Sequence, residues 1–139
     1  MQNDCVLCNS NAENVIYNSV LFRIVLVTDE YYPGYLRLIL NQHVKEITDL
    51  SIEDARVVFD ALYKIESIVR QIYQPDKMNL ASLGNVVPHL HWHIIPRYKN
   101  DRHFPNPIWG EVTSLAYRPD SSVTRLTISL QSQIAIAFA

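Results

Sequence analysis

The stretch His89-Leu90-His91-Trp92-His93-Ile94-Ile95-Pro96 contains three of the five histidines in the chain, and they alternate with apolar residues. Successive side chains of a β-strand point to opposite faces, so this alternation predicts His89, His91 and His93 on one face. Imidazole titrates near neutral pH and can act as a nucleophile, a proton carrier or a metal ligand. We therefore expect the functional site on this strand.

The spacing of the histidines leaves two kinds of chemistry open. A His-x-His pair on a strand can bind zinc from one face and leave a coordination position for a catalytic water. Alternatively, one imidazole can act as the nucleophile of covalent catalysis while another serves the leaving group. Spacing alone does not separate a zinc hydrolase from an enzyme with a nucleophilic histidine.

The length and composition favour a single globular domain over residues 1–139. A formal net charge of −2 does not suggest a surface for a nucleic-acid polymer. No apolar run approaches the roughly 20 residues of a membrane-spanning helix, and the N-terminal residues do not resemble a signal peptide. These features predict a soluble cytoplasmic protein that binds neither nucleic-acid polymers nor membranes.

The segments around the histidines alternate between strand and turn signals. Strands are expected at residues 15–17, 21–27, 35–40, 78–83 and 86–95. Pro33-Gly34 supplies turn chemistry between the second and third of these strands, which predicts an antiparallel hairpin. Pro96 and the proline-rich residues 104–109 indicate a long loop.

One long amphipathic helix is expected from Ser51 to about Tyr73. Ser51 followed by Asp54 resembles a capping box, and Pro75 ends the helix. Apolar residues then recur at spacings of three and four, at Ala55, Val58, Leu62, Ile65, Val69 and Ile72. Residues 121–138 mix β-branched residues with helical spacing, and we expect a short helical element there.

The sequence resembles the histidine triad (HIT) superfamily of nucleotide hydrolases and transferases. His89 to Ile95 match the pattern His-φ-His-φ-His-φ-φ, where φ is apolar. The resemblance also includes Pro33-Gly34 before a strand, residues 41–51 leading into the long helix, and Gly84-Asn85 before the triad. It covers most of residues 5–110, which we expect as the family-like core. The resemblance implies an α+β fold, a twisted antiparallel sheet of about five strands with one long helix and a short C-terminal element.

The resemblance favours covalent histidine catalysis. It implies a hydrolase that cleaves at the α-phosphate of adenosine-type nucleotides, either dinucleoside polyphosphates or nucleoside phosphoramidates. His91 would be the nucleophile and form a nucleotidyl-histidine, and His93 would contact phosphate oxygens or assist the leaving group. A zinc-dependent hydrolase that uses the triad, including His89, as metal ligands remains an alternative. A nucleotide-binding module with little catalysis is another.

Three further positions carry over from the family as candidate nucleotide contacts. Asn85 occupies the place of a family Gln that binds phosphate, although Asn is shorter by a methylene group. Asn79 lies near an upstream polar contact of the family. Asp29 is a candidate for the ribose hydroxyls, since a carboxylate can accept from both. The base pocket is expected to be apolar, with Phe22 and Ile24 or Leu26 as candidates. His103 has no motif support, and we expect it to be a solvated loop residue.

Cys5 and Cys8 are the two cysteines of the chain. In a chain without an export signal, Cys-x-x-Cys suggests a metal-binding or redox pair. The resemblance implies structural zinc, because some family members bind it with residues equivalent to Cys5, Cys8, His43 and His89. No organic cofactor is expected, and the family is commonly homodimeric.

Overall fold

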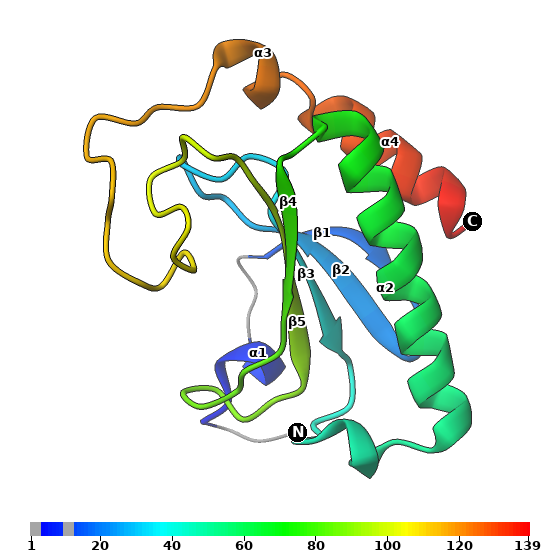
Figure 1. The fold of residues 1–139 in the computed structure, drawn as a ribbon. Helices are drawn as coiled ribbons and strands as arrows, with labels where there is room; N and C mark the ends of the chain where they lie inside the picture. Colours follow the sequence, from blue (N-terminus) through cyan, green and yellow to red (C-terminus); the bar gives the residue numbers. More distant parts are fainter. Residues whose placement is uncertain (1–3, 10–12) are drawn as a thin grey trace.

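The computed structural model describes residues 4–9 and 13–139. Its centre is one antiparallel sheet with the strand order β1-β2-β3-β5-β4. The strands are β1 Asn14–Asn18, β2 Phe22–Leu26, β3 Leu36–Leu40, β4 Lys77–Ala81 and β5 His91–Arg97. This confirms the expected α+β architecture, including the hairpin of β2 and β3 (Figure 1).

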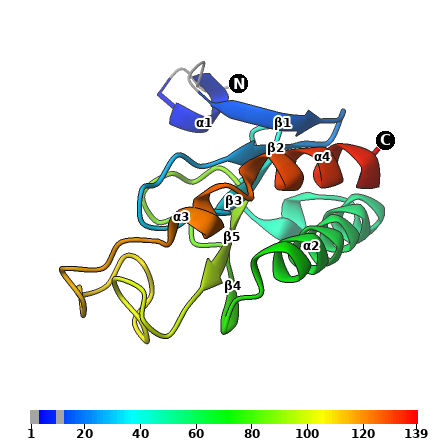
Figure 2. The same cartoon turned by 90° about the horizontal axis from the view of Figure 1, so that it is seen from above.

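Two helices, α2 (Ile52–Tyr73) and α4 (Thr127–Ala137), cover one face of the sheet. Figure 2 shows them side by side when the sheet is seen from above. The main hydrophobic core lies between these helices and the strands, and it includes Leu38 of β3 and Ile94 of β5. The C-terminal element is therefore helical, as expected, and follows the short α3 (Ser121–Thr124).

Local sequence explains why α2 begins and ends where it does. Ser51 is the N-cap, and its side chain accepts a hydrogen bond from the Asp54 backbone N–H. The expected apolar stripe is buried, apart from Ile72, which is partly buried. At the other end, Gly34 has a φ of +84°, and a Cβ there would lie 2.7 Å from the Tyr73 ring. A glycine is needed at this turn so that the last turn of α2 can pack on the hairpin.

The opposite face of the sheet carries the N-terminal segment and the long loop after β5. The short α1 (Val6–Asn9) packs through Leu7 on Val25 and Ile39. Residues 98–120 form the loop drawn from yellow to orange in Figure 1, away from α2 and α4. A 3₁₀ turn, η1 (Ile47–Asp49), connects β3 to α2. Among the described residues, no helix is long and apolar enough to cross a membrane.

The histidine strand differs from the expected one at both ends. The strand begins at His91, so His89 lies in the bend before it. Leu90, Trp92 and Ile94 all lie in the core under the helices, as the alternation predicts. The strand also continues through Pro96 to Arg97. β3 begins at Leu36, opposite Ile94, and does not extend to Pro96. Pro96 therefore pairs only with β4, and a residue without an N–H is tolerated there.

Candidate active site

A pocket of about 470 Å³ lies on the sheet face away from α2 and α4, where β5 and β3 meet the N-terminal segment. His91 and His93 reach it from β5, and Arg37 reaches it from β3, opposite His93 in the strand register. The remaining lining residues are Val6, Leu7, Leu83, Gly84, Asn85, Val86, Val87 and Trp109. The pocket thus combines an apolar wall with two imidazoles and one guanidinium group.

The orientation of the His91 ring is set by the main chain. His91 Nδ1 lies 2.5 Å from the carbonyl oxygen of His89, and because a carbonyl can only accept, Nδ1 carries the proton. Burial lowers the pKa of His91, which favours the neutral ring. In a neutral ring protonated at Nδ1, Nε2 keeps its lone pair. Nε2 also has no hydrogen-bond partner among the described residues, so it is available to attack an electrophile.

His93 is held between two aromatic side chains. Its Nδ1 is 2.5 Å from the Tyr35 hydroxyl, and its ring centroid is 4.8 Å from that of Trp109 and 4.9 Å from that of His91. Burial, followed by the charges of His91 and Arg37, lowers the pKa of His93 to about 3. His93 is therefore neutral at pH 7, and its ring position is fixed by contacts on three sides.

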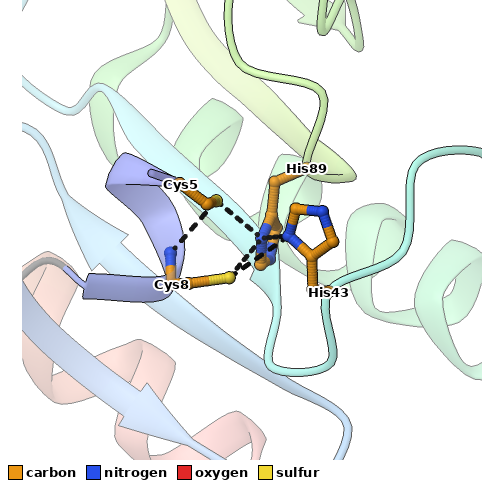
Figure 3. Close-up of side chains that lie close together, drawn as sticks. All are labelled: Cys5, Cys8, His43 and His89. Carbon is orange, nitrogen blue, oxygen red and sulfur yellow. Dashed lines mark hydrogen bonds between the residues drawn. The ribbon is translucent and has the colours of Figure 1, made fainter. Parts of the chain in front are cut away.

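The four expected metal ligands lie together, as Figure 3 shows. Their ligand atoms all lie within 4.8 Å of one another. His43 Nδ1 is 3.2 Å from Cys8 Sγ and 3.2 Å from His89 Nδ1. His89 Nδ1 is 3.4 Å from both sulfur atoms. Among the described residues, this is the only cluster of its kind, and it could hold a metal ion.

The second nitrogen of His89 supports a metal-binding role. Nε2 lies 2.6 Å from the carbonyl oxygen of Leu40, so Nε2 carries the proton and Nδ1 offers its lone pair to the cluster. In a tetrahedral zinc site the bond lengths place ligand atoms roughly 3.3 to 3.8 Å apart. The observed separations of 3.2 and 3.4 Å fall close to this range. The donor set of two sulfur and two nitrogen atoms fits a closed structural zinc site.

The three expected nucleotide contacts are not brought together. Asn85 is exposed and lines the pocket. Asn79 lies on β4 outside the pocket lining, where its Oδ1 accepts a hydrogen bond from Arg97 Nη1 at 2.8 Å. Asp29 also lies outside the pocket lining, and its Oδ1 accepts from the Tyr31 backbone N–H in a tight turn. Only Asn85 is therefore placed beside the histidines.

The expected base-pocket residues lie on the wrong face of the sheet. Phe22 and Ile24 belong to the core under α2 and α4, and Leu26 packs against the same core. The other face of the strand carries Arg23 and the apolar Val25. The alternation groups Phe22, Ile24 and Leu26 on one face, but it does not show whether that face meets the helices or the pocket. The apolar wall of the pocket comes instead from the N-terminal segment, from residues 83–87 and from Trp109.

Sequence reasoning also missed a buried polar network that holds the long loop against the sheet. Arg97 donates to both carboxylate oxygens of Asp101, at 2.7 and 3.0 Å, and both side chains are almost fully buried. Arg97 also donates to the Asn106 carbonyl. Asp101 further accepts from the backbone N–H groups of Tyr98, His103 and Phe104. These contacts anchor Asp101 and Asn106, in the loop that leads to Trp109, to Arg97 at the end of β5.

His103 is not the solvated residue that was expected. Its ring is partly buried, and its Nδ1 forms a hydrogen bond with the Tyr32 hydroxyl. It does not line the pocket. His103 therefore belongs to the surroundings of the Arg97–Asp101 pair.

Comparison with known proteins places this site in a family. The HIT domain family model matches residues 9–100, which is more than half of the chain, and the chain belongs to this family. The bis(5'-adenosyl)-triphosphatase of Saccharomyces cerevisiae is 32% identical to it over 93 residues, which are 63% of this chain and 45% of the relative. The chain spans about half the length of the curated relatives it matches.

Solved structures support the same assignment. A histidine triad protein from Bradyrhizobium japonicum superimposes with a TM-score of 0.71 and 29% identity, covering 86% of this chain and 87% of its own. A histidine triad protein from Marinobacter aquaeolei gives a TM-score of 0.74 and 25% identity, with 91% of both chains covered. Both matches extend over nearly the whole chain, whereas the family model ends at residue 100.

Proposed function

We propose that this protein is a nucleotide hydrolase or transferase that acts at the α-phosphate of adenosine-type nucleotides through a covalent adduct on His91. The observation that carries the proposal is the hydrogen bond from His91 Nδ1 to the His89 carbonyl, which leaves the Nε2 lone pair available in the pocket. Membership of the HIT domain family and the activity in the name of the yeast relative support the nucleotide class.

The proposed reaction has two steps with balanced bonds and protons. His91 Nε2 attacks the α-phosphorus, a phosphorus–nitrogen bond forms, and the bond to the leaving group breaks. When the Tyr35 hydroxyl donates to His93 Nδ1, His93 carries its proton on Nε2 and can donate a hydrogen bond from it to the leaving group. A phosphate leaving group then departs as an anion, and an amine leaving group takes its proton from solvent. A water oxygen then attacks the phosphorus of the adduct, the phosphorus–nitrogen bond breaks, and one proton of the water passes to solvent. This releases the nucleoside monophosphate and restores neutral His91.

The class of reaction can be tested with diadenosine triphosphate, diadenosine tetraphosphate and adenosine phosphoramidate in ¹⁸O-labelled water. Attack at the α-phosphorus puts the label in AMP, whereas attack at an inner phosphorus puts it in the other product. A reaction that requires added inorganic phosphate would identify a transferase. Binding of these compounds without turnover would favour the alternative of a nucleotide-binding module.

The geometry does not favour the alternative in which the triad itself holds a catalytic zinc. His89 lies outside the strand, with its ring in the cysteine cluster. His91 and His93 each use Nδ1 in a hydrogen bond within the protein. Within the described part of the chain, no third ligand joins these two rings in a metal-binding cluster.

We further propose that Cys5, Cys8, His43 and His89 hold a structural zinc ion. A reducing compartment suits such a site, because the thiols must stay unoxidised to bind the metal, and a cytoplasmic location therefore stays our proposal. The metal would fix the N-terminal segment to the bend before β5. It would also fix Val6 and Leu7, which lie between the two cysteines and line the pocket.

Removal of this metal is expected to lower stability by several kcal/mol and to weaken nucleotide binding through loss of the pocket wall. Elemental analysis before and after chelation should show one zinc per chain lost in parallel with a fall in the unfolding temperature. Cys8→Ser should reproduce both effects, and chelation of that variant should cause little further change. Full stability with no bound metal would contradict the zinc site.

A homodimer is also proposed, formed through β4. β4 is an edge strand of the described sheet, and such edges can pair with a second chain. The exposed apolar side chains Leu80, Phe59 and Tyr63 lie on β4 and on α2. Sedimentation of the purified protein would show whether it is dimeric, and Leu80→Asp should then favour the monomer.

A further inference from the structure

Among the described residues that line the pocket, Arg37 is the one with a permanent charge. It lies on β3, directly opposite His93 of β5, and it lines the same pocket as His91 and His93. Its neighbours along β3 show the alternation that places it there, because Leu36 and Leu38 are buried in the core under α2. The strand therefore presents one guanidinium group to the pocket from an otherwise apolar stretch.

The guanidinium of Arg37 is incompletely partnered. Its Nε is buried and has no hydrogen-bond partner. Its centre is 5.7 Å from the centroid of the Tyr35 ring. In the described part of the chain, Arg23 and Arg97 form ion pairs with carboxylates, whereas Arg37 forms none. A buried donor without an acceptor is costly. Because Arg37 also lines the pocket, its guanidinium is suited to an acceptor that enters there.

The surroundings of Arg37 favour an anion as that acceptor. None of the residues that line the pocket is an aspartate or a glutamate. On the facing strands, Arg37 lies opposite Val25 and His93, which is neutral at pH 7. The described lining of the pocket therefore contains one positive charge, that of Arg37, and no negative one. Charge-assisted hydrogen bonds from a guanidinium to phosphate oxygens are among the strongest polar contacts in proteins.

We propose that Arg37 binds a phosphate group of the substrate next to the one that His91 attacks, and so makes the site selective for nucleotides with a chain of two or more phosphates. This inference rests on the proposed function, and it chooses between the two substrate classes considered there. A phosphoanhydride offers a second anionic phosphate to Arg37. A phosphoramidate has one phosphate and an amine leaving group, and it offers none.

The binding part of the proposal can be tested without turnover. In a His91→Asn background, AMP, ADP and ATP are titrated calorimetrically into the full chain with and without Arg37→Met. Arg37→Met is expected to weaken the binding of ADP and ATP by about 10- to 100-fold, the range for the loss of hydrogen bonds to a charged group. The affinity for AMP should fall by less than about threefold. Arg37→Lys, which keeps the charge and loses the Nε donor, should give an intermediate affinity for ATP.

A matched control is Arg56→Met, which removes the same charge from an exposed position on α2. It should leave all three affinities unchanged. Thermal unfolding of each variant shows whether a loss of binding reflects a loss of folded protein. Equal weakening of AMP and ATP by Arg37→Met, or no weakening of either, would overturn the role of Arg37.

The kinetic counterpart uses the protein with His91 intact. Arg37→Met should lower kcat/KM for diadenosine triphosphate by about 10- to 100-fold and for adenosine phosphoramidate by less than about threefold. Equal losses for both substrates would contradict the selectivity. If neither substrate is turned over by the protein with Arg37 in place, the proposed function fails. That outcome is distinct from a failure of Arg37 alone, which leaves turnover of both substrates intact.

Discussion

His91→Asn is expected to lower turnover of the preferred nucleotide by roughly ten-thousand-fold or more, while nucleotide binding persists. The loss is large because the proposed nucleophile cannot be replaced by a neighbour: His93 Nδ1 is occupied by Tyr35, and the ring of His89 lies in the cluster with Cys5, Cys8 and His43. The measurement is single-turnover release of nucleoside monophosphate, with calorimetry for binding.

The covalent adduct itself provides a second measurement. Phosphorus–nitrogen bonds are labile in acid, so the reaction is quenched in alkaline denaturant before mass spectrometry. The protein with His91 should gain the mass of a nucleotidyl group on the peptide that contains β5, and His91→Asn should not. His103→Asn serves as the control, since His103 lies outside the pocket lining. Turnover by His91→Asn at the original rate would end the covalent proposal.

Asp101→Asn is expected to destabilise the protein by about 3 to 5 kcal/mol, the range for breaking a buried ion pair by removing one partner. The substitution leaves the Arg97 guanidinium buried without its counter-charge, and it weakens the backbone contacts of the loop that carries Trp109. Urea unfolding monitored by tryptophan fluorescence measures the change. A weaker contact between Trp109 and His93 should also raise KM.

The exposed pair of Lys64 and Asp60 supplies the control for this prediction. These side chains retain 49% and 65% of their accessible surface, and Asp60→Asn should cost less than about 0.5 kcal/mol. An equal cost for Asp60→Asn and Asp101→Asn would contradict a special role for burial.

The effect of Asp101→Asn should also depend on pH. Burial by itself would raise the pKa of Asp101, but hydrogen bonds from Arg97 and from three backbone N–H groups lower it below its usual value. An acid with a lowered pKa in the folded state stabilises the protein above its unfolded pKa, and that contribution is lost as the pH falls through the folded value. The difference in free energy of unfolding between the unchanged protein and Asp101→Asn should therefore become smaller below about pH 4.

The sequence was most informative where one physical cause decides the structure. The helix from Ser51 to Tyr73 followed from its cap and its apolar stripe, and both features are local. The cysteine cluster could be expected only from the resemblance, because Cys5 and His89 are far apart in the chain. The position of His89 before the strand was missed, because Pro88 and the bend there do not interrupt the alternation of histidines.

Residues whose role depends on tertiary packing could not be predicted from the sequence. Arg37 carried a signal, a charged residue within an apolar strand, but only the register opposite His93 shows what it faces. Arg97, at the end of β5, and Asp101, in the following loop, have no sequence signal that predicts their burial as a pair. The sequence of β2 separates a face with Phe22 and Ile24 from a face with Arg23 and Val25. Only the fold shows that Ile24 packs under the helices while Val25 packs on the N-terminal segment.

The two polar ends of His89 assign it to two different parts of the molecule. Its ring belongs to the cysteine cluster, while its carbonyl oxygen accepts a hydrogen bond from His91 Nδ1. A substitution at His89 changes the ring and leaves the carbonyl in place. Substitution of the His89 side chain therefore tests only its proposed role as a metal ligand. The backbone contact that orients His91 is unchanged by such a substitution, so side-chain mutagenesis does not detect it.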